Sequence, residues 1–191
     1  MTEKLRMLFW GMLAALGALA LESLVMVFAT PINMVGSVDA PAWFMPIGVF
    51  IEELFAITLI GKLLQNSPDK NNIFARAIFF GIGFSLPEIL LNFANFSDLS
   101  QKILSAYLGL LLIHTATAGI FGCYFSRKEG LRPEAIFFLG LAILSHLVFN
   151  LSVISSLSIW LSLSIPLVTL FICFSALKIA PVKTALPTRK N

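Results

Sequence analysis

The chain has 191 residues and a formal net charge of +3, with 58% hydrophobic and only 12% charged residues. Soluble domains carry about twice that share of charge, so the composition excludes one and predicts a protein that crosses the lipid bilayer several times. The basic residues form no cluster of the kind that binds nucleic acid, which excludes that class of partner.

The first apolar segment covers residues 7–29, after a short lead that contains Lys4 and Arg6. This start resembles a signal peptide, with Ala18–Ala20 as a cleavage site. However, the apolar run continues to Ala29, where a mature secreted protein would normally become polar. We therefore favour an uncleaved first helix.

Five more apolar segments follow, separated by polar turns that contain proline, glycine or serine. We expect helices at about residues 42–64, 73–93, 103–125, 133–151 and 157–177. No internal repeat and no long polar block divides the chain. The predicted fold class is therefore all-α: a polytopic membrane protein with a bundle of six transmembrane helices, forming a single domain over residues 1–191.

The basic residues indicate the orientation of this bundle. Six spans place alternate loops on opposite sides, and Lys102 is the only basic residue on one of those sides. The other side holds Lys4, Arg6, Lys62, Lys70, Arg76, Arg127, Lys128, Arg132, Lys178, Lys183, Arg189 and Lys190. The positive-inside rule then predicts that both termini are cytoplasmic.

Two adjacent acids, Glu52 and Glu53, occupy the middle of the second predicted helix. Their neighbours from Ala42 to Gly61 are almost all apolar or small. A charged side chain at the centre of a bilayer costs about 2.5 kcal/mol or more, and such residues usually mark a functional site. This pair is therefore the first candidate for the chemistry of the protein.

Three other helices place ionisable residues at a similar depth. A rise of about 1.5 Å per residue puts Glu52, Glu53, Glu88, His114 and His146 roughly 14–20 Å from the cytoplasmic ends of their helices, near the midplane. One residue of this kind could be a structural hydrogen bond between helices. Five at one level predict a functional cluster.

Local sequence around these residues adds detail. Pro87 removes one backbone donor just before Glu88, a feature that is tolerated where a helix lines a cavity. Ala118 and Gly122 form a small face that predicts close helix packing. His146 and Asn150 lie one turn apart on one helix face. Glu22 falls nearer the outer surface, and we interpret it as structural.

A carboxylate, two histidines and an amide donor are suited to hydrolysis of a peptide bond. In one version Glu52 or Glu53 takes a proton from water, and His146 with Asn150 stabilises the oxyanion. In the other version Glu88, His114 and His146 hold a divalent metal such as zinc, with a water in the open position. Both versions fit the residue types, so both stay open.

Four short motifs occur here in one order: Glu52-Glu53; Gly81-x-Gly-Phe84-x-x-x-Glu88; His114-Thr-Ala-Thr-Ala-Gly-Ile-Phe-Gly122; and His146-x-x-x-Asn150. This set resembles the PrsW-type intramembrane proteases, which are related to the CAAX prenyl endopeptidases and bacteriocin-processing proteases. The resemblance covers residues 44–150. It implies an endopeptidase with a membrane-anchored protein or peptide substrate, such as an anti-sigma factor, in the bacterial cytoplasmic membrane.

One position departs from that family pattern. The paired glutamates are commonly followed by a basic residue one turn later, whereas here the nearest is Lys62. A CAAX or bacteriocin-processing type of protease is one alternative, although those enzymes usually have histidine at the position of Glu88. A non-catalytic membrane scaffold or immunity protein is another, and a proton-coupled transporter that uses the Glu/His cluster is a third.

Overall fold

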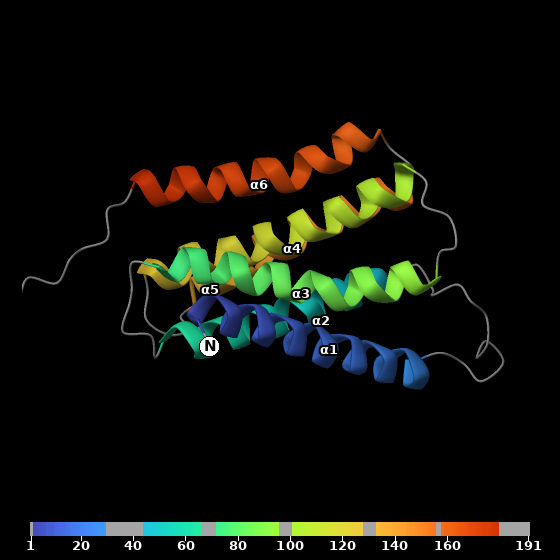
Figure 1. Ribbon diagram of the computed structural model, residues 1–191, viewed down its shortest axis with the longest axis horizontal. Coiled ribbons are helices and arrows are strands. Elements are labelled where there is room, and N and C mark those ends of the chain that lie inside the picture. The colour runs from blue at the N-terminus through green and yellow to red at the C-terminus, as the bar shows by residue number, and fades with distance from the viewer. Residues whose placement is uncertain are drawn as a thin grey trace, which may run out of the picture.

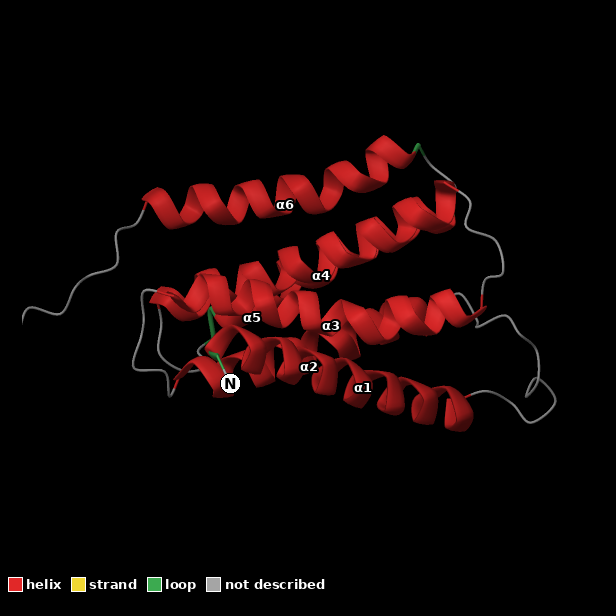
Figure 2. Ribbon diagram, in the orientation of Figure 1, coloured by secondary structure: helices red, strands yellow, loops and turns green. Residues whose placement is uncertain are grey.

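The computed structural model describes residues 2–29, 44–65, 72–95, 101–127, 133–155 and 158–179. Six α-helices make up the regular structure of these ranges (Figure 2): α1 (Glu3–Ala29), α2 (Phe44–Gln65), α3 (Ile73–Asn95), α4 (Gln101–Arg127), α5 (Ala135–Ile154) and α6 (Ile159–Ile179). Successive helices run in opposite directions (Figure 1). The prediction of an all-helical fold is confirmed.

The helix ends lie within a few residues of the predicted ones. The largest difference is at the start of the chain, where α1 begins at Glu3. Arg6 donates to the Glu3 carboxylate at 2.9 Å across one turn, a contact that stabilises helical structure in the polar residues before the apolar segment. At the other end α1 runs without interruption through Ala18–Ala20 to Ala29.

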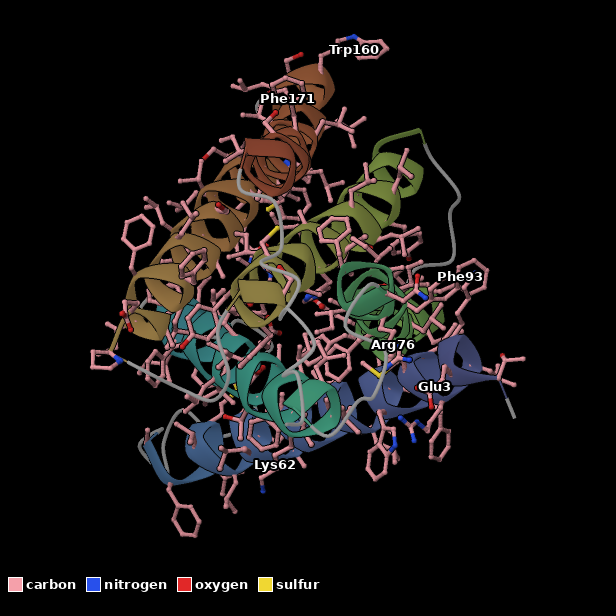
Figure 3. The ribbon with its side chains drawn as sticks, turned by 90° about the vertical axis from the view of Figure 1, so that its left-hand side faces the viewer. Glu3, Lys62, Arg76, Phe93, Trp160 and Phe171 are labelled. Atoms are coloured by element: carbon pink, nitrogen blue, oxygen red, sulfur yellow. The ribbon has the colours of Figure 1, made fainter. Side chains whose placement is uncertain are left out.

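Four helices are long and apolar enough to cross a membrane: α1, the Ile73–Leu91 part of α3, the Ala106–Ser126 part of α4, and α5. This composition indicates a membrane protein. Within the residues that the structure describes, α6 contributes a shorter apolar stretch, Trp160–Cys173, and α2 is not among these four. Six spans and cytoplasmic termini therefore remain predictions. Trp160 and Phe171 point away from the bundle (Figure 3), as side chains that face lipid would.

The helices form a closed ring in which each contacts two neighbours, in the spatial order α1, α3, α4, α6, α5, α2. α4 also contacts α2 and α5 across the ring, and it is the most buried of the four candidate membrane spans. The view along the bundle shows the same arrangement (Figure 3). This order brings α2, α3, α4 and α5 together, and these are the helices that carry the predicted cluster.

Glycines allow the neighbouring backbones to approach closely. A Cβ atom at Gly11 would collide with the carbonyl oxygen of Phe80, and one at Gly83 with the carbonyl oxygen of Leu8, so α1 and α3 are in backbone contact. On α4, a Cβ at Gly122 would lie 2.6 Å from the Cβ of Ala77. The predicted small face of α4 is thus confirmed as a packing surface, and its partner is α3.

Candidate functional site

A buried hydrogen bond joins α2 to α5 at the centre of the site. The Nδ1 atom of His146 lies 2.8 Å from Oε1 of Glu53, and both side chains are 1% exposed. These residues are 93 positions apart in the sequence. The basic partner that the sequence lacks one turn after Glu53 is therefore present in space, because α5 supplies it.

A second pair joins α3 to α4. The Nε2 atom of His114 lies 2.9 Å from Oε2 of Glu88. Phe84 precedes Glu88 by one helical turn, and its ring centroid lies 5.0 Å from that of His114. The Phe84-x-x-x-Glu88 spacing thus has a local reason: both side chains project from one face of α3 and hold the same imidazole. α3 continues as a helix through Pro87.

The two histidines connect the pairs. Their ring centroids are 4.8 Å apart with an interplanar angle of 87°, an edge-to-face contact. His114 is 2% exposed and His146 is 1% exposed, so the contact is shielded from solvent. Four helices therefore converge on one pair of imidazole rings, as expected from the depth of these residues in their helices.

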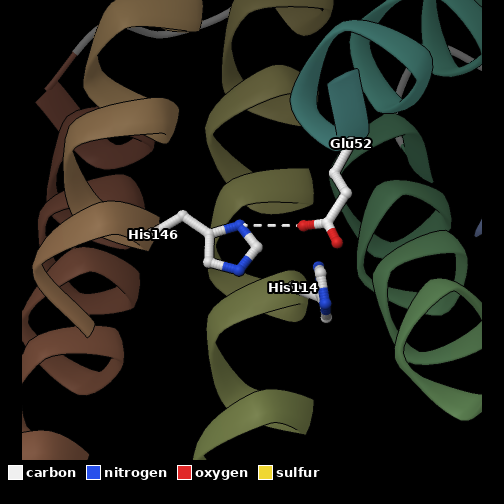
Figure 4. Close-up of side chains that lie close together, drawn as sticks. All are labelled: Glu52, His114 and His146. Atoms are coloured by element: carbon white, nitrogen blue, oxygen red, sulfur yellow. Dashed lines mark ion pairs between the residues drawn. The ribbon is translucent and has the colours of Figure 1, made fainter. Parts of the chain in front are cut away.

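Glu52 takes a different position from its neighbour Glu53. Its carboxylate points toward both histidines (Figure 4), with Oε2 3.6 Å from Nδ1 of His146. One ligand atom each from Glu52, His114 and His146 lies within 4.8 Å of the other two. These three residues could hold a metal ion.

The ligand atoms of Glu52, His114 and His146 fit a metal ion if the three side chains move closer together than their present separations of up to 4.8 Å. Four ligands around zinc lie about 3.3 Å apart when each bond is about 2.0 Å long. Histidine ligands usually donate their other ring N–H to a carboxylate, which fixes the orientation of the ring. Glu53 and Glu88 occupy such positions next to His146 and His114.

This geometry changes the role that the sequence suggested for Glu88. The metal hypothesis placed Glu88 with the two histidines, whereas the carboxylate that the structure groups with them is Glu52. Glu88 instead bonds to one ring nitrogen of His114, and its side chain is 29% exposed. Asn150 lies one turn after His146 and is half-buried, and in the described part of the chain no hydrogen bond links its amide to the cluster.

The structure adds Glu22 of α1, for which the sequence suggested a structural role. Its carboxylate lies against α2 at Gly48, where an added Cβ would be 3.5 Å from Oε2. Glu22 interacts electrostatically with Glu88 and His146, and also with Glu52. One signal in the sequence could have indicated this: Gly48 precedes Glu52 by four residues, so it leaves space on the same helix face.

Comparisons of this chain with protein-family models, with curated proteins and with solved structures found no match.

Proposed function

We propose that this protein is an intramembrane endopeptidase that hydrolyses a peptide bond of a membrane-anchored substrate. The resemblance of the four motifs to PrsW-type proteases suggests this reaction. The observation that carries the proposal is the convergence of Glu52 with two histidines, each of which is held by a carboxylate of its own.

Glu52 is the best candidate for the general base. Glu53 is engaged by His146 at 2.8 Å, whereas Glu52 has no contact that short to a basic group among the described residues. The Glu52 side chain is 11% exposed and that of Glu53 is 1% exposed, so water reaches Glu52 more easily. General-base catalysis by a positioned carboxylate typically contributes about 10²–10⁴-fold to a rate.

The proton and the electron pairs can be followed through the reaction. The water oxygen forms a bond to the scissile carbonyl carbon while the Glu52 carboxylate takes a proton from that water. An N–H of His114 or His146 donates to the oxyanion. The carbon–nitrogen bond then breaks, and Glu52 returns the proton to the leaving nitrogen. The products are a carboxylic acid, which ionises, and an amine.

The same residues support a metal-assisted version of this hydrolysis. Glu52, His114 and His146 would hold a zinc ion, which supplies Lewis-acid activation of water when it is bound. Glu53 and Glu88 would orient the two imidazoles by accepting their remaining N–H groups. In this version Glu53, whose Oε2 is buried without a hydrogen-bond partner among the described residues, is the carboxylate left to accept the proton.

A comparison of whole membranes tests the proposal even while the substrate is unidentified. Cells that produce the wild-type chain or Glu52→Gln are compared by sequencing the amino termini of their membrane proteins. We expect new amino termini within predicted transmembrane segments in membranes with the wild-type chain or the control variant, but not in those with Glu52→Gln. The control is Glu134→Gln, since Glu134 is exposed and lies outside the cluster. Identical sets of termini for all three chains would overturn the proposal.

A further inference from the structure

The cluster contains more acidic than basic side chains. Four carboxylates from three helices act on one another there, those of Glu22, Glu52, Glu53 and Glu88. The charges that act most strongly on Glu22, Glu52 and Glu88 belong to glutamates and histidines. Two imidazoles therefore face four carboxylates.

The hydrogen bonds divide these acids into two groups. Glu53 and Glu88 each have a histidine, at 2.8 and 2.9 Å respectively. Glu22 has no hydrogen-bond partner for Oε1 among the described residues, although that atom is buried. Glu53, at 1% exposure, likewise leaves Oε2 without a partner in the same part of the chain. A buried carboxylate oxygen without a donor is costly, so a donor or a cation from outside this chain would stabilise it.

The position of Glu22 makes it accessible to such a group. Glu22 precedes the end of α1 at Ala29 by seven residues, and Glu88 precedes the end of α3 at Asn95 by seven residues. Both are thus about 10 Å from the same end of the bundle. Both are partly exposed, unlike Glu53 and the two histidines. Glu22 and Glu88 therefore form the open edge of the cluster.

We propose that Glu22 binds a positively charged side chain of the membrane-anchored substrate, a lysine or an arginine close to the bond that is cut. This inference rests on the proposed function and specifies its substrate class. Lysine and arginine near the end of a transmembrane helix extend along the helix toward the polar surface. A lysine or arginine about two turns inside the substrate helix lies at the level of Glu22, so its charge can reach this carboxylate.

Gly48 gives this inference a steric basis. The Glu22 carboxylate rests on Gly48 of α2, one turn before Glu52. A cation bound to Glu22 would therefore lie beside the face of α2 that carries Glu52. The substrate backbone attached to that cation would be brought to Glu52 and the two histidines.

Synthetic transmembrane peptides provide the test. The probes are three leucine–alanine helices of about 20 residues that carry lysine, glutamine or glutamate two turns from the outer end. Fluorescence energy transfer measures the affinity of each peptide for the wild-type chain, Glu22→Gln and Glu22→Lys. A chelator is present in every sample to remove metal ions. Glu134→Gln is the control for a lost acid, and thermal unfolding checks that each variant is folded.

We expect the wild-type chain to bind the lysine peptide about tenfold more tightly than the glutamine peptide. Glu22→Gln should remove this preference, and Glu22→Lys should reverse it in favour of the glutamate peptide. Equal binding of the lysine and glutamine peptides to the wild type would overturn the inference, as would a lysine preference that survives Glu22→Gln. Binding does not require hydrolysis, so a chain that shows the preference but cuts no protein would contradict only the proposed function.

Discussion

The Nδ1 atom of His146 lies 2.8 Å from Oε1 of Glu53 in a position where each side chain is 1% exposed. Removal of one member of such a pair leaves the other buried without its partner. We expect His146→Ala to lower the free energy of unfolding by about 3–5 kcal/mol. Glu53→Gln keeps a hydrogen-bonding group of the same shape and should cost about 1 kcal/mol. Chemical unfolding in detergent micelles measures both, and a loss in Glu53→Gln as large as that in His146→Ala would contradict a pairing that depends mainly on the hydrogen bond.

Substitution of Glu52 by glutamine should change the free energy of unfolding differently from the same substitution of Glu53. Glu52→Gln removes a carboxylate whose shortest ion-pair contact is 3.6 Å among the described residues, so the free energy of unfolding should stay the same or rise. Cleavage of an identified substrate should fall by about 10²–10⁴-fold. Rates measured in reconstituted vesicles test this, alongside Glu134→Gln. Retained cleavage in Glu52→Gln, together with its loss in Glu53→Gln, would reassign the base to Glu53.

The metal hypothesis makes separate predictions for ligands and for the residues that orient them. Zinc content of the purified protein, measured by elemental analysis, should be lost in His114→Ala and in Glu52→Gln. Glu88→Gln should keep the site but bind zinc about 10–100-fold more weakly, since Glu88 only orients His114. Complete loss in Glu88→Gln with retention in Glu52→Gln would restore Glu88 as the ligand.

The close contact of α1 with α3 predicts a pair of contrasting glycine variants. Gly83→Leu places a side chain against the backbone of Leu8, so α1 must move and the bundle should unfold at a markedly lower temperature. Gly140→Ala is the control, because nothing lies within 4 Å of the added Cβ. It should be neutral or stabilise the helix by up to about 1 kcal/mol. Similar melting temperatures for the two variants would contradict this description of the packing.

The sequence predicted the helices and the level of the cluster well for a physical reason. Runs of about 20 apolar residues between polar turns define helices almost without reference to tertiary structure. Depth along a helix follows from counting residues, so Glu88, His114 and His146 could be placed in one layer. The ring contact between the two histidines and the hydrogen bonds around it support that layer.

The positions of the helices around the ring could not be predicted from the sequence in the same way. Which carboxylate faces which imidazole depends on the order of helices around the ring, and no local pattern specifies that order. For this reason the sequence suggests Glu88 as a metal ligand. In the structure Glu88 instead bonds to a ring nitrogen of His114, and Glu52 is the carboxylate grouped with the two histidines. The place of Glu22 in the cluster likewise depends on a tertiary contact, that of α1 with Gly48.

The long separation of Glu53 from His146 has a consequence for biogenesis. His146 is synthesised 93 residues after Glu53, which takes about 5–20 s at typical translation rates. During this interval two carboxylates of α2 lack the imidazole on α5, and each would cost about 2.5 kcal/mol or more in lipid. We therefore expect α2 to reach its final place in the membrane only when α5 arrives. A chain that stalls before α5 should be left at the insertion machinery with α2 exposed to proteases.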